Sequence, residues 1–194
     1  MNASAKKTTK SKKIGRLFLK AVVILFLLIL LVIALLDIFS VAVISLGYYF
    51  NWSSSMPIGL YKVSAPTNLN RGDDVVVCLP QSVGSIGLKR GYLNPGHCPG
   101  GYSPIIKELV AVPGDNVTLT PQSIVVNGQA YDALLHKQDS DGLPLESVPR
   151  GINSQTPDYW LYGKGSPSDS WDSRYWGGVD RSSIIKKAAP ALTY

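Results

Sequence analysis

The most apolar stretch of the chain lies close to its N-terminus. Residues 21–36 contain no charged or strongly polar side chain, and a second apolar stretch follows Asp37 through residues 38–50. A helix that crosses the hydrocarbon core of a bilayer needs about 20 residues. The pattern therefore predicts one transmembrane helix over residues 17–39, with Lys20 extending toward one headgroup layer and Asp37 close to the other.

Basic residues are concentrated before this span. The chain carries seven lysines and arginines and no acidic side chain before Asp37, and its remaining 12 basic residues are balanced by 13 acidic ones. Because basic residues flank spans on the cytoplasmic side, residues 1–16 are predicted to be a cytoplasmic tail and residues 40–194 an extracytoplasmic domain. A basic run confined to such a tail does not indicate a nucleic-acid partner.

A cleaved signal peptide is the competing interpretation of the N-terminus, because it also places a charged region before an apolar one. The apolar stretch is longer than the usual core of a signal peptide, and no clean A-x-A cleavage site follows it. We therefore expect an uncleaved membrane anchor.

Beyond the span, short β-branched runs alternate with glycine and proline, and no long segment repeats apolar residues at helical spacing. This pattern predicts a mainly β, or all-β, domain. The clearest strands are expected at residues 75–79, 105–112, 117–120, 123–126 and 159–162. Asn127-Gly128 predicts a hairpin turn after the fourth strand, and residues 113–115 predict a turn after the second. Residues 135–155 are typical of an exposed loop or inserted excursion.

The two cysteines, Cys78 and Cys98, are the only ones in the chain. In an oxidising compartment such a pair favours a disulfide that closes a loop of about 20 residues. Metal binding is the weaker alternative, since two sulfurs and the nearby His97 do not complete a tetrahedral site. No other metal or phosphate-binding motif occurs, so neither a metal nor a cofactor is expected.

A hydrolase built on this chain would need a base other than histidine, because His97 and His136 both lie in turn or loop contexts. Lysine can serve only where apolar surroundings favour its neutral form. In the second predicted strand, the two-residue period places Lys107 on the same face as Leu109 and Ala111. The alternative is an edge-strand lysine that points to water.

A cluster of hydroxyl groups follows the span. Ser53, Ser54 and Ser55 precede Pro57, which restricts the backbone, and Gly59, which frees it. Such a loop can present a nucleophile. The alternative is a polar linker after an anchor, which is the commoner use of these residues.

Two segments match the glycosylation acceptor pattern, Asn51-Trp52-Ser53 and Asn116-Val117-Thr118. The match matters only in a pathway that glycosylates, and we treat it as chance.

Four aromatic residues just beyond the span predict an interfacial belt: Tyr48, Tyr49, Phe50 and Trp52.

Four segments resemble, in order and in spacing, the motifs of the type I signal peptidases. The resemblance is greatest to their conjugative-transfer branch, the TraF-type peptidases that mature pilin precursors. The segments are a serine box (residues 55–61), a region before the lysine strand (residues 90–99), a lysine box with its hairpin (residues 107–115 and 124–128) and a C-terminal box (residues 172–177). The resemblance implies a signal-peptidase-like all-β catalytic domain.

The resemblance also implies catalytic roles. Ser55 is expected to attack the scissile carbonyl, while Lys107, neutral when buried, accepts its proton and later gives it to the leaving amine. The backbone N–H of Ser55 and the hydroxyl of Ser53 are expected to bind the oxyanion.

Three supporting residues follow from the same comparison. Ser170 is expected to orient the lysine, and Asp172 and Arg174 are expected to form an ion pair behind the site. The family's usual Gly-Asp-Asn-Arg-Asp lead-in is replaced here by Gly-Lys-Gly-Ser-Pro-Ser-Asp at residues 163–169. Lys164, within that replacement, is expected to be a surface loop lysine.

The implied protein is a serine endopeptidase in the bacterial inner membrane, with a cytoplasmic N-terminus and a periplasmic catalytic domain. Its expected substrate is an exported, pilin-like precursor cut after small side chains, and some TraF-type members join the new ends into a circle. Two alternatives stay open. One is a general signal peptidase I, and the other is a non-catalytic bitopic subunit of a secretion or pilus assembly.

Overall fold

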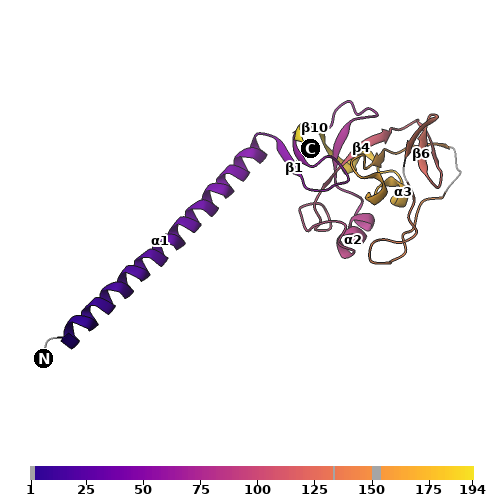
Figure 1. Cartoon of the computed structure of the whole chain (residues 1–194). Coiled ribbons are helices and arrows are strands. Elements are labelled where there is room, and N and C mark those ends of the chain that lie inside the picture. Colours follow the sequence, from indigo (N-terminus) through magenta and orange to yellow (C-terminus); the bar gives the residue numbers. More distant parts are fainter. Residues whose placement is uncertain (1–2, 133, 150–153) are drawn as a thin grey trace. The chain divides into compact units, whose positions relative to one another are not determined.

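The computed structural model describes residues 3–132, 134–149 and 154–194. The chain divides into two compact units between Leu46 and Gly47. The first unit is one long helix, and the second is rich in β-strands (Figure 1).

Helix α1 (Ala3–Ser45) contains the apolar stretch near the N-terminus. Its segment Leu19–Val43 is the one helix segment, within the described ranges, that is long and apolar enough to cross a membrane. The large apolar side chains along it are about half exposed, which water disfavours and lipid accepts. The helix continues past residue 39, since residues 40–45 contain neither proline nor glycine.

The second unit contains two antiparallel sheets, so the prediction of a mainly β domain is confirmed. The six-stranded sheet has the order β1 (Tyr48–Asn51), β2 (Gly59–Ser64), β10 (Ile184–Thr193), β3 (Asp74–Val77), β4 (Ile105–Ala111), β9 (Trp160–Tyr162). The four-stranded sheet has the order β7 (Gln129–Asp132), β6 (Ser123–Val126), β5 (Asn116–Leu119), β8 (Ser154–Gln155). The helical elements of this unit are short: α2 (Gln81–Lys89), α3 (Ser173–Trp176) and the 3₁₀ turns Pro167–Asp169 and Arg181–Ser183.

The predicted strands correspond to β3, β4, β5, β6 and β9, and their ends agree to within two residues. The hairpin prediction is also confirmed. Asn127 and Gly128 both have positive φ, at 49° and 85°, and they connect β6 to β7 through the pair Val126–Gln129. A turn of this kind requires positive φ at both central residues, which asparagine and glycine tolerate.

Strand β10 was not predicted, although it is the longest strand in the β unit and lies between β2 and β3. Its sequence contains two lysines and Pro190, and most of its side chains are exposed, so it lacks the apolar alternation that marks a strand. The ladder with β2 shifts register between Pro190 and Leu192, where the missing N–H of the proline is accommodated.

Helix α2 was also missed, because it contains two glycines, which weaken helix propensity. The packing explains them. A Cβ atom on Gly84 would lie 2.1 Å from the Tyr102 ring, and one on Gly87 would lie 2.7 Å from the Trp171 ring. The helix therefore approaches the rest of the domain more closely than any larger residue would allow.

Both faces of the central strands are buried. Val75 and Val77 belong to one apolar cluster, whereas Val76 of the same strand packs with Ile106 in another. A continuous apolar run is typical of a strand covered on both sides. Lys107 is therefore located in a strand that has little access to water on either face.

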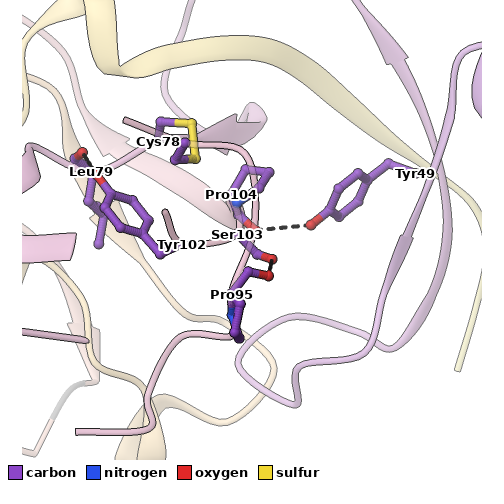
Figure 2. Close-up of a disulfide and its surroundings, with 8 residues drawn as sticks. Tyr49, Cys78, Leu79, Pro95, Tyr102, Ser103 and Pro104 are labelled. Carbon is purple, nitrogen blue, oxygen red and sulfur yellow. Dashed lines mark hydrogen bonds between the residues drawn. A yellow bond between two sulfur atoms is a disulfide. The ribbon is translucent and has the colours of Figure 1, made fainter. Parts of the chain in front are cut away.

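A disulfide joins Cys78, directly after β3, to Cys98 in the loop that follows α2. Figure 2 shows the hydrogen bonds that hold the surrounding segment. They run from Tyr49 Oη to the Pro104 carbonyl at 2.9 Å, from Ser103 Oγ to the Pro95 carbonyl at 2.7 Å, and from Tyr102 Oη to the Leu79 carbonyl at 2.5 Å. The covalent link and these bonds fix the segment that carries α2 against the large sheet.

Removing this link should destabilise the β unit. Replacing both cysteines by serine (Cys78→Ser with Cys98→Ser) should lower the free energy of unfolding by about 3 kcal/mol, because the unfolded chain regains the freedom of a closed loop of this length. Urea denaturation with and without a reductant measures the change. A wild-type chain whose unfolding midpoint does not respond to the reductant would contradict the prediction.

Candidate active site

One cleft of about 530 Å³ in the β unit is lined by four of the site residues predicted from the sequence. Ser53, Ser55, Lys107 and Ser170 all line it, although they come from segments far apart in the chain. The predicted supporting pair, Asp172 and Arg174, is fully buried behind the cleft.

The loop between β1 and β2 carries the serines. Ser55 is 9% exposed, and the neighbouring Met56 is fully buried and anchors the loop in the core. The hydroxyl oxygens of Ser53 and Ser55 lie 3.0 Å apart, and the backbone N–H of Ser55 donates to Ser53 Oγ at 3.4 Å. Two hydroxyl groups and one backbone N–H therefore converge at the edge of the cleft.

Asn51 fixes both ends of this loop. Its buried side-chain amide donates to the carbonyls of Ser53 at 2.8 Å, Met56 at 3.2 Å and Pro57 at 3.1 Å, and its Oδ1 accepts the Ser53 N–H at 3.2 Å. This role of Asn51 was not predicted, since the residue was interpreted only as part of a chance glycosylation match. The available signal was an asparagine at the start of a turn, where its side chain commonly bonds the backbone two residues on.

Lys107 lies in β4, and its side chain is almost entirely buried. Its Nζ donates to Ser170 Oγ at 2.7 Å. Burial lowers the pKa of Lys107 from 10.5 to about 8; the negative charge of Asp172 opposes this change, and the positive charge of Arg174 adds to it. A substantial fraction of the lysine is therefore neutral at mildly alkaline pH.

The segment after β9 brings Ser170 close to the serine loop. A Cβ atom on Gly163 would lie 2.1 Å from Ser170 Oγ and 3.0 Å from the Ser55 carbonyl oxygen. The Gly165 N–H donates to that same carbonyl at 3.0 Å. Only a residue without a side chain fits at position 163, and the close approach that results places the serine loop beside Ser170.

Arg174 holds the backbone behind Ser170. Its guanidinium donates to Asp172 Oδ1 at 2.7 Å and also to three carbonyl oxygens, those of Ser170 at 2.7 Å, Pro167 at 2.6 Å and Leu134 at 2.8 Å. A buried ion pair is costly unless its remaining hydrogen-bonding capacity is satisfied, as it is here. The arrangement fixes the position from which Ser170 meets the lysine.

Asp172 extends the same network toward the serine loop. Its Oδ2 accepts the N–H of Gly163 at 3.1 Å, and its Oδ1 caps α3 by accepting the N–H of Arg174 at 3.3 Å. One carboxylate thus positions both the glycine beside Ser170 and the helix that carries the arginine.

Lys164 is a loop residue, as expected, but its amine is engaged. It donates to Asp74 Oδ1 at 2.6 Å and lies 3.3 Å from Glu108 Oε2. Asp74 and Glu108 are directly paired between β3 and β4. Lys164 therefore fastens the segment after β9 to the large sheet, next to the strand that carries Lys107.

The two histidines differ in position. The exposed His136 lines the cleft, and its backbone N–H donates to the hydroxyl of Tyr175 at 3.2 Å, whereas His97 does not line it. Within the described ranges, the Ser55 hydroxyl bonds to Ser53 and to no histidine. The cleft therefore contains a buried serine and a buried lysine, and its histidine is exposed.

The chain matches the family described as "Signal peptidase, peptidase S26" over residues 16–192. It belongs to this signal peptidase family.

Two relatives of this chain carry names that refer to plasmid or conjugal transfer. It is 36% identical over 152 residues to "Plasmid transfer protein TraF" of Escherichia coli, and 33% identical over 151 residues to "Conjugal transfer protein TraF" of Agrobacterium fabrum. Each match covers 76% of this chain and 84% of the relative. A crystal structure of a signal peptidase I from Enterococcus faecalis matches with a TM-score of 0.36 and 17% identity, covering 62% of this chain and 96% of that one.

The buried lysine of the peptidase should make its stability depend on pH. Because the pKa of Lys107 is about 8 when folded and about 10.4 when unfolded, the folded state binds fewer protons between these values and is penalised below them. Lys107→Met should therefore stabilise the chain by up to about 3 kcal/mol at pH 6.

This gain should shrink as the pH rises through 8 and should disappear above about pH 10.4, where the lysine is neutral in both states. Urea denaturation of the two proteins at pH 6, 8 and 10 measures it. An equal stability difference at every pH would show that the lysine is not desolvated.

Loss of the Asn51 amide should loosen the serine loop. Asn51→Ala leaves buried carbonyls without a donor and should cost about 1–3 kcal/mol. It should also slow the acylation of Ser55 by a penem, because the hydroxyl is no longer held in place. Asn116→Ala, an exposed asparagine in the other acceptor match, is the control. Equal acylation rates in the two variants would contradict the role given to Asn51.

Proposed function

We propose that this chain is a membrane-anchored serine endopeptidase in which Ser55 is the nucleophile and Lys107 the general base. The observation that supports the proposal best is the buried amine of Lys107, held by Ser170 in the cleft that Ser55 also lines. An amine is a useful base near neutral pH only where burial favours its neutral form.

The proposed reaction proceeds through an acyl-enzyme. Neutral Lys107 removes the proton from Ser55 Oγ as that oxygen attacks the scissile carbonyl carbon. The resulting ammonium protonates the leaving amine as the C–N bond breaks. The same lysine then removes a proton from a water molecule that attacks the ester carbonyl carbon, and it returns this proton to Ser55 Oγ as the ester C–O bond breaks, which releases the product's new C-terminus.

The developing oxyanion is the former carbonyl oxygen of the substrate, and it needs hydrogen-bond donors beside the carbon that Ser55 Oγ attacks. The Ser55 N–H lies 3.4 Å from Ser53 Oγ, and Ser53 Oγ lies 3.0 Å from Ser55 Oγ, so both proposed donors lie next to the nucleophile. A backbone donor and a hydroxyl donor can together stabilise the tetrahedral intermediate. Asn51 holds Ser53 in this position, because its Oδ1 accepts the Ser53 N–H.

Proton transfer requires Lys107 and Ser55 to meet during the reaction. In the described structure the Lys107 amine bonds Ser170, and the Ser55 hydroxyl bonds Ser53. Catalytic hydrogen bonds in a free enzyme are often formed only when substrate binds. In this proposal Ser170 keeps the amine in the cleft and oriented until substrate brings the serine within reach.

The proposed substrate is an exported precursor protein, specifically a conjugative pilin precursor. The curated relatives carry the names conjugal transfer protein and plasmid transfer protein, which favours a peptidase dedicated to a transfer system over a general signal peptidase. The apolar helix α1 is proposed to anchor the chain, with its N-terminus in the cytoplasm and the β unit in the periplasm.

Single substitutions test the catalytic pair. Ser55→Ala and Lys107→Met should each reduce processing of the precursor by at least about 10⁴-fold, because each removes a group required for acylation. The adjacent Ser54, whose side chain is exposed, supplies the control Ser54→Ala, which should process normally. Thermal denaturation checks that all the variants fold. Full processing by either catalytic variant would refute the proposal.

The fate of the acyl-enzyme distinguishes hydrolysis from cyclisation. An amine of the same substrate chain that intercepts the ester gives a circular product, lighter by one water than the linear one. Mass spectrometry of the product formed from a transfer-system precursor reads this difference directly. Equal processing of unrelated secretory precursors would instead favour the general peptidase.

A further inference from the structure

Residues 137–145, predicted as part of an exposed loop, form an ordered turn. The Leu145 N–H donates to the Lys137 carbonyl at 2.9 Å, and the Asp139 N–H donates to the Leu143 carbonyl at 2.9 Å. These two bonds join the ends of the segment as in a hairpin. We refer to this segment as the 137–145 turn.

The side chain of Asp139 is the centre of the turn and is only 6% exposed. Its Oδ1 accepts the N–H of Asp141 at 3.0 Å and that of Leu143 at 2.8 Å, while its Oδ2 accepts the hydroxyl of Tyr92. The guanidinium of Arg90 lies 3.8 Å from the same Oδ2. Both carboxylate oxygens are therefore occupied, one within the turn and one across to the segment after α2.

The opposite segment is itself tied to the catalytic side of the domain. Arg90 donates to the Pro144 carbonyl of the turn at 2.9 Å. The Tyr92 ring packs against Trp171, with ring centroids 5.1 Å apart, and Trp171 directly follows Ser170. Asp139 thus connects the 137–145 turn, through Tyr92 and Trp171, to the segment that carries Ser170.

The turn and the segment after α2 both line the cleft that contains Ser55 and Lys107. We infer that the 137–145 turn is a wall of the substrate cleft, and that Asp139 is the positioning residue that holds this wall in place. The inference rests on the proposed function and extends it. It assigns a role in substrate binding to residues far from the reacting atoms, namely contact with the polypeptide on either side of the scissile bond.

The chemistry of the wall indicates what it binds. From the turn and the residue before it, the His136 imidazole, the Gln138 amide and the Ser140 hydroxyl line the cleft, whereas Leu93 and Leu145 give it an apolar part. Such a wall suits an extended polypeptide that offers backbone and polar side-chain hydrogen bonds. A continuous apolar helix would leave these polar groups without partners.

Asp139 itself is not proposed as a binding group for substrate. Its carboxylate already accepts bonds from Tyr92, Asp141 and Leu143, and these bonds together with Arg90 hold the pKa of Asp139 below its usual value. Its effect on catalysis should therefore be indirect, through the place of the turn, and should be visible in substrate binding and not in the reactivity of Ser55.

The test compares Asp139→Ala with Asp141→Ala in the full-length chain. Asp141 belongs to the same turn, is exposed, and contributes its backbone N–H but no described side-chain bond. Three quantities are measured: KM for a precursor-derived peptide, the rate of Ser55 acylation by a small penem, and the rate of tryptic cleavage after Lys137.

In Asp139→Ala, KM and the rate of tryptic cleavage should each rise about tenfold, while the penem acylation rate should stay within about twofold of wild type. Asp141→Ala should resemble wild type in all three measurements. Should Asp139→Ala fail to fold, Tyr92→Phe removes one bond to the carboxylate, and a smaller change in the same direction is expected.

Two results would overturn the inference. Faster tryptic cleavage with an unchanged KM would show that the turn does not contact substrate, and unchanged tryptic cleavage would show that Asp139 does not hold it. Failure of the proposed function is distinguishable, because wild-type Ser55 would then not be acylated at all, and the substrate wall would be rejected together with the peptidase.

Discussion

The Lys107 amine is held out of water, and the proposed chemistry of the site is possible only because of this burial. A lysine is rarely buried without a carboxylate partner, because its charged form is strongly favoured in water. Here the nearest described partner is the neutral hydroxyl of Ser170. A hydroxyl accepts a hydrogen bond from a neutral amine but compensates little for a buried positive charge, so the fold favours the form of lysine that can act as a base.

Much of the β unit serves to maintain this environment. Strands β3 and β4 are covered on both faces, and Val75 lies directly opposite Lys107 in their ladder. Asp172 and Arg174 form an ion pair, so their charges act in opposite directions on the pKa of Lys107, and Arg174 also donates to the Ser170 carbonyl. A nearby carboxylate without that arginine would raise the pKa of the lysine further and favour its charged form. The ion pair is thus compatible with a neutral amine, because the two charges pair with each other and their hydrogen-bonding groups have partners.

The sequence predicted the parts of the fold that have strong local signals. The strand around Lys107 and the Asn127-Gly128 turn can each be predicted from neighbouring residues alone, and both were placed correctly. Strand β10 and the 137–145 turn could not be found in this way. The former is stabilised by pairing with β2 and β3, and the latter by Asp139 bonding Tyr92 across 47 residues. Ser170 was found through family resemblance, since nothing local marks that serine.

The burial of this amine is tested most directly by titrating Lys107 itself. NMR of the wild-type chain, labelled at its lysine side-chain carbons, observes the titration, and the Lys107→Met variant identifies the signal of Lys107. The account predicts a midpoint of about 8 for this lysine. A midpoint close to the ordinary value of about 10.4 would mean that the amine remains protonated under working conditions, and the Ser–Lys mechanism would be contradicted.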